Sequence, residues 1–131
     1  MHVISLPLII RRNGKTSFSL NLNTYRNAKF YLLNDVKILF KELVAPHVGA
    51  LPSMTNCRLT YTVYPGTKRA FDIGNVCSVV DKFFSDALVE LGKLPDDCYH
   101  HLAQITYRFG AVDKENPRVE VLIEETECKS P

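Results

Sequence analysis

Residues 71–97 read FDIGNVCSVVDKFFSDALVELGKLPDD, and we take this stretch as the one that organises the fold. Apolar residues recur in it at steps of three and four, the spacing that places side chains on one face of a helix. They are Val76, Val79, Val80, Phe83, Phe84, Ala87, Leu88 and Leu91. We therefore expect one amphipathic helix here, with Asn75 as its N-cap and Gly92 as its C-terminal stop.

Polar residues occupy the opposite face of this expected helix, and carboxylates lie at both of its ends. The polar face carries Ser78, Asp81, Lys82, Ser85, Asp86 and Glu90, while Asp72 precedes the helix and Asp96-Asp97 follow it. Gathered carboxylates are what a protein needs to hold Mg²⁺ against phosphate. Each of them can equally be a cap, a solvated residue or a turn residue, so both interpretations stay open.

Length and composition predict one globular domain of a soluble protein over residues 1–131. Hydrophobic residues make up 46% of the chain and charged residues 23%, which is ordinary for that class. No apolar run approaches the ~20 residues needed to span a bilayer, so we expect no membrane association. The four cysteines form no Cys-x-x-Cys pair, which favours reduced thiols in a cytoplasmic protein.

The charges are unevenly distributed along the chain. Residues 1–69 hold ten Lys or Arg and two acids, whereas residues 70–131 hold six Lys or Arg and twelve acids. A basic half can bind a polyanion while an acidic half supplies metal ligands. Alternatively, the two halves interleave in space and the asymmetry cancels.

The first half of the chain predicts a hairpin, a helix and a strand. Residues 3–10 and 18–22 have strand character on either side of an Asn-Gly turn, which indicates a β-hairpin with a basic tip. A helix of about twenty residues should follow, beginning at Asn23 or Thr24 and stopped near Ala45 by Pro46. Residues 58–64 are the clearest strand pattern in the sequence.

The second half adds the organising helix and two further strands. We expect those strands at residues 100–109 and 118–123, followed by a solvated acidic tail from about residue 124. The resulting order, ββαβαββ, predicts an α+β domain with two helices packed on one mixed or antiparallel sheet.

The residues from Asp72 to Asp97 resemble the RusA-like Holliday junction resolvases, which are small phage and prophage endonucleases. The signature of that family is Asp-x-Asp-Asn opening a helix, then a Lys and an Asp four residues apart, then an Asp-Asp pair. Here Asp72 and Asn75 match the opening, Lys82 and Asp86 match the helical pair, and Asp96-Asp97 match the last pair. In addition, Asn23-Thr24-Tyr25-Arg26 looks like the Asn-x-Tyr-Arg stretch of the family.

Two departures from the family pattern affect the metal site and the helix. Gly74 stands where the second opening Asp is expected, which argues that the metal site is altered or weakened. About four extra residues separate Asn75 from Lys82. This is close to one helical turn, so Lys82 and Asp86 stay on the same face of the helix as in the family pattern. Asp81, Asp86 or water could replace the lost ligand.

The resemblance implies a Mg²⁺-dependent endodeoxyribonuclease, with Mn²⁺ as a substitute, that resolves four-way junctions or other branched DNA by paired phosphodiester hydrolysis. It also implies a homodimer and a phage-infected or prophage-carrying bacterial cell. The expected catalytic residues are Asp72, Lys82, Asp86, Asp96 and Asp97, of which Asp72 and Asp97 would bind the metal. The expected DNA contacts are Arg11, Arg12, Lys15, Tyr25, Arg26, Lys68 and Arg69.

Two alternatives and one geometric difficulty accompany this hypothesis. The departure at Gly74 is compatible with a relative that binds branched or single-stranded DNA without cleaving it. A zinc site from Cys98, His100 and His101 is weakly indicated, because adjacent strand residues point to opposite faces. Finally, a helix of sixteen residues spans about 24 Å, so Asp72 and Asp97 meet most easily across a dimer boundary.

Overall fold

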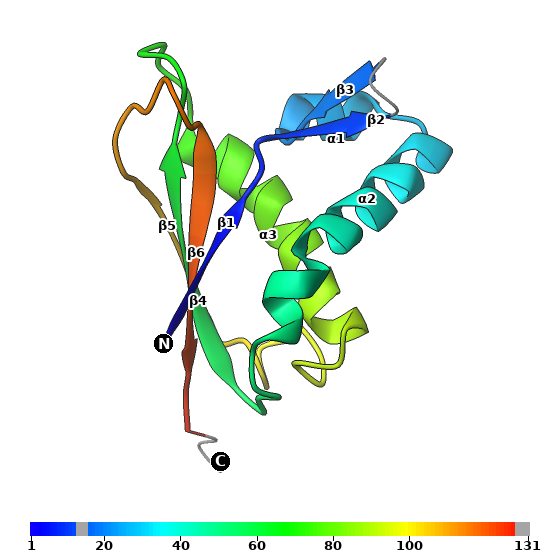
Figure 1. Cartoon of the computed structure of the whole chain (residues 1–131), viewed down its shortest axis with the longest axis vertical. Coiled ribbons are helices and arrows are strands. Elements are labelled where there is room, and N and C mark those ends of the chain that lie inside the picture. The colour runs from blue at the N-terminus through cyan, green and yellow to red at the C-terminus, as the bar shows by residue number, and fades with distance from the viewer. Residues whose placement is uncertain (13–15, 128–131) are drawn as a thin grey trace.

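A four-stranded sheet forms one layer of the chain, and its helices lie on one side of it (Figure 1). The computed structural model describes residues 1–12 and 16–127. Within them the sheet has the order β1-β6-β4-β5, and a separate two-stranded sheet pairs β2 with β3. The strands are β1 (His2–Leu6), β2 (Ile9–Arg12), β3 (Thr16–Ser19), β4 (Cys57–Tyr64), β5 (Gln104–Phe109) and β6 (Arg118–Glu125).

The described part of the chain also forms three helices: α1 (Leu22–Asn27), α2 (Phe30–Gly49) and α3 (Ile73–Glu90). The expected α+β class and mixed sheet are therefore confirmed, because β4 runs parallel to β5 and antiparallel to β6. The expected order ββαβαββ is wrong. The chain runs β1-β2-β3-α1-α2-β4-α3-β5-β6, with one more strand and one more helix than predicted.

The extra strand arises because the first apolar run serves two different sheets. Pro7, which has no N–H to donate to a ladder, separates β1 from β2. β1 pairs with β6 in the main sheet, whereas β2 pairs with β3 in the predicted hairpin. The tip of that hairpin, including Lys15, lies outside the described residues.

The extra helix arises from a break at Ala28 and Lys29, where the backbone is extended. The first helix is capped by Asn21, whose side chain accepts from the Thr24 amide at 2.9 Å, and not by Asn23 or Thr24. Pro46 does not stop the second helix, which continues to Gly49. The loss of one backbone bond at Pro46 is offset by packing, because Val44 and Val48 on either side of it are buried.

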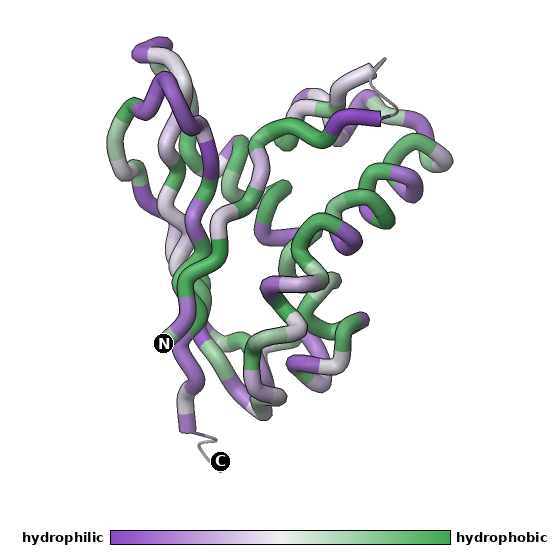
Figure 2. The backbone as a smooth tube through the Cα atoms, viewed as in Figure 1, coloured by the Kyte–Doolittle hydropathy of each residue, from purple (hydrophilic) through white to green (hydrophobic). Residues whose placement is uncertain are grey.

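Helix α3 lies between the sheet and the other two helices, and it carries the largest share of the apolar core. Its buried residues are Cys77, Val79, Val80, Phe83, Phe84, Ser85, Ala87 and Leu88. The predicted apolar face is thus confirmed over most of its length, whereas Ser85 was expected on the polar face. In Figure 2, hydrophobic stretches follow α2, α3 and the neighbouring strands.

Only the C-terminal end of α3 matches the prediction. Asp72 occupies the N-cap position and the helix begins at Ile73, so the expected cap Asn75 instead lies in the first turn. Its backbone amide donates to the Asp72 carbonyl at 3.0 Å. Gly92 ends the helix as predicted: its φ of +77° is a left-handed conformation that glycine adopts without strain.

The last two strands also differ from their expected bounds. His100 and His101 belong to a turn rather than to the following strand, and the His101 amide donates to the Cys98 carbonyl at 3.0 Å. The acidic tail expected from residue 124 is wrong for Glu124 and Glu125, which belong to β6. Glu124 is held there by Arg58 of β4, with two hydrogen bonds of 3.0 Å.

No helix of the described residues is long and apolar enough to cross a membrane.

Candidate functional site

An open cleft of about 910 Å³ lies at the N-terminal end of α3. Three segments that are distant in sequence line it: Asn21, Asn23 and Thr24 at the start of α1, Thr67, Arg69, Ala70, Phe71 and Asp72 in the loop before α3, and Asn75 and Val76 in α3. The fold therefore brings the first residues of both stretches that carry the resemblance, Asn23-Thr24 and Asp72 with Asn75, into one cleft. Hairpin β2–β3 and α1 lie at this same end of the molecule (Figure 1).

The chemistry of this cleft is polar, with one exposed cation and one exposed carboxylate. Arg69 and Asp72 are both exposed, and neither forms an ion pair with any residue of the described ranges. The Asp72 side chain caps no amide of α3, so its carboxylate is free to accept from another group. Exposed backbone amides at a helix N-terminus favour anions, which makes the cleft suited to a phosphate.

The loop that carries Arg69 and Asp72 is anchored at its start. The Asp113 amide donates to the Pro65 carbonyl at 2.8 Å, which joins this loop to the loop before β6. The Arg118 guanidinium lies 4.2 Å from the centre of the Tyr64 ring and pairs with Asp113 at 2.8 Å. Arg118 thus ties the end of β4 to the neighbouring loop.

Lys82 contacts a second residue of the predicted site. Its Nζ lies 5.4 Å from the centre of the Tyr25 ring, a cation–π distance, and the Tyr25 ring packs edge-on against Phe83. The structure therefore brings together one expected catalytic residue and one expected DNA contact. Lys82 does not pair with Asp86, although the two residues are one helical turn apart.

Asp86 is instead part of the packing between α2 and α3. Its Oδ2 accepts from Lys37 Nζ at 3.0 Å, and Glu90 pairs with Lys41 at 2.8 Å one turn further on. The hydrogen bond to Asp86 raises the pKa of Lys37. These pairs join the basic and acidic halves of the sequence, as Arg58 and Glu124 also do, so part of the charge asymmetry cancels within the fold.

Asp81 is the most extensively bonded carboxylate near α3, although it was not among the expected catalytic residues. Its Oδ1 accepts from Tyr61 at 2.8 Å and from Ser85 at 2.9 Å, and its Oδ2 accepts from Tyr107 at 3.4 Å. Burial raises the pKa of Asp81, the three hydrogen bonds oppose that shift, and the negative charge of Asp97 adds to it. Burial also raises the pKa of Tyr107 to about 12.

No local pattern identifies Asp81 as an internal carboxylate. It falls on the face of α3 that periodicity assigns to solvent, and its main partner, Tyr61, lies 20 residues earlier in β4. Because both of its oxygens accept from protein groups, we interpret Asp81 as a structural carboxylate. It is not available to replace the metal ligand that is missing at Gly74.

Asp96 and Asp97 form an exposed turn beyond α3. The Asp97 amide donates to Asp96 Oδ1 at 2.8 Å, and this bond lowers the pKa of Asp96. The negative charge of Asp97 contributes to the raised pKa of Asp81 at the middle of α3, whereas Asp72 occupies the N-cap of this helix.

The expected Mg²⁺ site of Asp72 and Asp97 stays a prediction. Among residues 1–12 and 16–127, no three His, Cys, Asp or Glu side chains are grouped so that they could hold a metal ion. The cleft contributes Asp72 as its only carboxylate, with Asn21, Asn23 and Asn75 as neutral neighbours. Catalytic Mg²⁺ is usually held by one or two carboxylates together with water and substrate phosphate, so the cleft offers the smallest such set.

The expected basic contacts are distributed over the same end of the molecule. Arg11, Arg26 and Lys68 are exposed, as is Arg69. Arg12 is half-buried and pairs with Asp35 at 3.0 Å, which reduces its availability for a phosphate.

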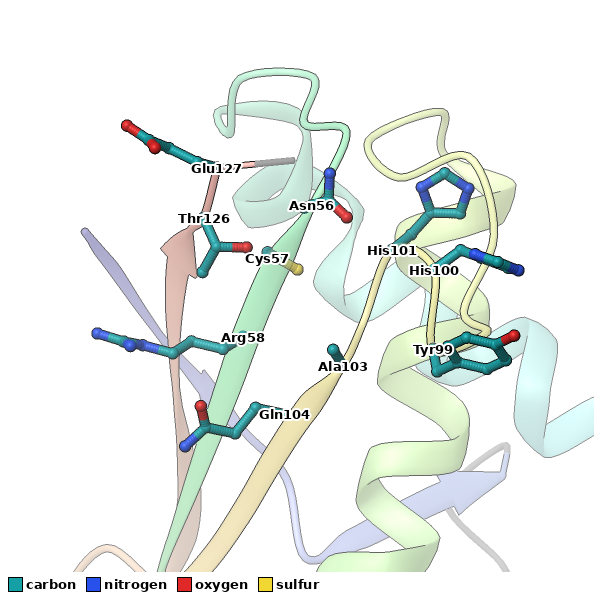
Figure 3. Close-up of a pocket in the computed structure, with 10 residues that line it drawn as sticks. All are labelled: Asn56, Cys57, Arg58, Tyr99, His100, His101, Ala103, Gln104, Thr126 and Glu127. Atoms are coloured by element: carbon teal, nitrogen blue, oxygen red, sulfur yellow. The ribbon is translucent and has the colours of Figure 1, made fainter. Parts of the chain in front are cut away.

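A second cavity, of about 590 Å³, lies at the opposite end of the sheet and is drawn in Figure 3. The weakly indicated zinc site falls beside it but is not formed. The His100 ring stacks on Tyr99 at 4.3 Å, and His101 Nδ1 is 2.8 Å from the Thr55 carbonyl. The Cys57 thiol also lines the cavity, and burial raises its pKa to about 11, which makes it unreactive at neutral pH.

No protein-family model matches this chain, and no curated protein matches it significantly.

Proposed function

We propose that this protein binds branched DNA through the cleft at the start of α3 and the basic residues around it. One observation carries the proposal: the cleft joins Asn23 and Thr24 of α1 with Arg69 and Asn75 beside the exposed first turn of α3. Arg, Asn and Thr side chains and helix N-termini are the groups that most often contact DNA phosphates.

The expected DNA contacts extend this surface beyond the cleft. Arg11, Arg26 and Lys68 are exposed, and the backbone of a nucleic acid is neutralised by such cations without regard to sequence. Lys82 and Tyr25 form a further cationic and aromatic pair. The preference for branched DNA rests on the resemblance of the Asp72–Asp97 stretch to RusA-like resolvases.

Binding without cleavage by a single chain is the form of the proposal that the geometry favours. The five residues expected to be catalytic occupy separate surroundings: Asp72 in the cleft, Lys82 over Tyr25, Asp86 against Lys37, and Asp96-Asp97 in the turn beyond α3. A hydrolytic metal centre needs its carboxylates within one coordination sphere.

The test is binding of a labelled four-way junction, the matching linear duplex and a single strand, in EDTA and at several salt concentrations. We expect the junction to bind more tightly than the duplex, with an affinity that falls as salt rises. Equal affinity for junction and duplex would contradict recognition of the branch. Incubation with Mg²⁺ or Mn²⁺ should leave the junction intact when the chain is monomeric.

Cleavage by two copies acting together is a second candidate, favoured by the positions of Asp72 and Asp97. Both are exposed, with Asp72 at the N-cap of α3 and Asp97 in the segment after the helix, so a second copy can supply the carboxylate that the first lacks. A dimer also offers two centres for the two strands cut at a junction.

This second candidate has a direct complementation test. Asp72→Asn and Asp97→Asn are each expected to abolish nicking of the junction, because each removes one half of every shared site. Mixing the two variants should restore one intact site in each heterodimer. No recovery of nicking, with subunit exchange proven by mass, would exclude a shared site.

A further inference from the structure

Strand β5 forms an unpaired edge of the main sheet. It pairs with β4 on one side, and no other described strand lies on its other side. Five of its six residues are exposed, and Tyr107 is half-buried. An edge strand presents a row of free N–H and C=O groups, which is a template for another strand.

The backbone groups that face outward can be identified from one hydrogen bond. The Gly110 amide, directly after β5, donates to the Val63 carbonyl of β4 at 2.9 Å. Alternate residues of a strand direct their N–H and C=O to the same side. Residues 106 and 108 therefore face β4 with Gly110, and the free groups belong to Ile105, Tyr107 and Phe109.

The same three residues share one side-chain face. Tyr107 donates to Asp81 of α3, so its side chain lies on the helical side of the sheet, and Ile105 and Phe109 lie on that side by alternation. Their side chains are 40% and 51% exposed. The strand has little of the usual protection against pairing: it contains no proline, and its one charge, Arg108, lies on the other face, where it donates to Thr62.

We propose that β5 pairs antiparallel with β5 of a second copy of this chain, with a two-fold axis at Tyr107. This register sets Ile105 opposite the partner's Phe109 and Tyr107 opposite the partner's Tyr107. The free backbone groups then form about six inter-strand hydrogen bonds, and the apolar side chains form cross-strand pairs.

A second copy suits this edge because the sequence of β5 is complementary to itself in that register. Arg108 falls opposite the partner's Thr106, so the only charge of the strand does not face its own copy. An isologous interface needs such self-complementarity, and the register centred on Tyr107 pairs all three outward-facing residues within the strand while keeping Arg108 away from its own copy.

The axis also fixes the relation between the two α3 helices. Tyr107 contacts Asp81, which lies at the middle of α3, so the axis passes beside the midpoint of the helix. A two-fold there sets the helices antiparallel, with the Asp72 end of one toward the Glu90 end of the other. The interface stands on the β5 edge alone and holds whether or not the protein binds DNA.

The experiment is a charge-swap series at two exposed positions, with mass measured by sedimentation and light scattering. The native chain should give twice the 14.9 kDa of one chain. Ile105→Lys/Phe109→Lys sets two cations opposite each other and should give a monomer. Ile105→Lys/Phe109→Glu sets a cation opposite an anion and should restore the dimer. Val3→Lys, on the exposed part of the other edge strand, should leave the dimer intact.

Each outcome decides the proposal once circular dichroism and thermal melting show that every variant is folded. A native monomer at high protein concentration overturns it, and so does a dimer that survives Ile105→Lys/Phe109→Lys. Dissociation by Val3→Lys would place the interface at β1 instead. Failure of Ile105→Lys/Phe109→Glu to recover the dimer would exclude the register centred on Tyr107.

Discussion

The hydroxyl of Tyr61 donates a 2.8 Å hydrogen bond to Asp81 Oδ1 and so joins the middle of β4 to the middle of α3. Tyr61 is fully buried, and its ring packs edge-on against Phe84 and Tyr107. The bond therefore lies inside the contact between the sheet and its central helix, and it fixes how α3 sits on the sheet.

Removal of this hydroxyl should destabilise the fold. Tyr61→Phe keeps the ring and leaves Asp81 with one donor fewer, so we expect a loss of about 1–3 kcal/mol in the free energy of unfolding. Urea unfolding followed by circular dichroism measures it. Tyr64→Phe is the matched control, because the Tyr64 ring packs on Arg118; its effect should stay within about 0.5 kcal/mol. Equal effects of the two variants would contradict the structural role of Asp81.

Asp81 should make stability fall as pH rises. Because burial raises the pKa of Asp81 in the folded state, the folded chain holds the proton more tightly than the unfolded chain. That contribution is complete below the ordinary pKa of an aspartate, 3.8, and is lost as pH rises through the folded pKa. Asp81→Asn has no proton to lose, so it does not show this decrease. The free energy of unfolding of the variant, measured relative to that of the native chain, should therefore increase from pH 3.5 to pH 7.

Glu90, whose pKa is shifted in the opposite direction from that of Asp81, provides the control for that experiment. The hydrogen bond from Lys41 lowers the pKa of Glu90, so its contribution is present above the unfolded pKa and is lost as pH falls. Glu90→Gln should therefore lose stability relative to the native chain as pH rises over the same range. The same pH trend for both variants would show that neither carboxylate behaves as described.

Arg69 should contribute a phosphate contact to DNA binding. Arg69→Ala is expected to weaken binding to junction and duplex alike and to reduce the slope of log affinity against log salt by about one. Lys93→Ala removes a cation just beyond the opposite end of α3 and should leave both quantities unchanged. Fluorescence anisotropy at four or more salt concentrations measures both. An unchanged slope for Arg69→Ala would place the DNA elsewhere on the protein.

Gly74→Asp should be accepted by the fold and should stabilise it. A Cβ at Gly74 meets nothing within 4 Å, and its φ is not positive, unlike that of Gly92. A carboxylate in the first turn also interacts favourably with the helix dipole, so we expect a gain of roughly 0.5–1 kcal/mol. Gly92→Asp forces a side chain into a left-handed conformation and should destabilise by about 1–2 kcal/mol. Thermal melting compares the two variants.

The same variant tests the effect of the missing acid. Gly74→Asp adds a carboxylate two residues after Asp72, where the family signature has one, so any Mn²⁺-dependent nicking of a junction should increase. A stable variant with no change in nicking would show that the absent acid is not what limits cleavage.

The sequence alone determined the elements whose signal is local. The three- and four-residue spacing predicts α3 because a buried helix face must repeat at that period, and Gly92 predicts its end because the stop requires a positive φ. Residues 58–64 have the composition of a strand, and the sum of these elements predicts an α+β domain. Such signals depend on the conformation and burial of neighbouring residues, which the sequence records directly.

Only the tertiary structure decided which residues meet. Pro46 lies inside a helix because Val44 and Val48 are packed on both sides of it, and β1 leaves the hairpin because β6, more than a hundred residues later, provides its partner. Lys37 rather than Lys82 pairs with Asp86, and Tyr61 turns Asp81 into an internal carboxylate. Periodicity shows that a residue is buried or exposed, but a partner across the core is set by how whole elements pack, and that information is not local.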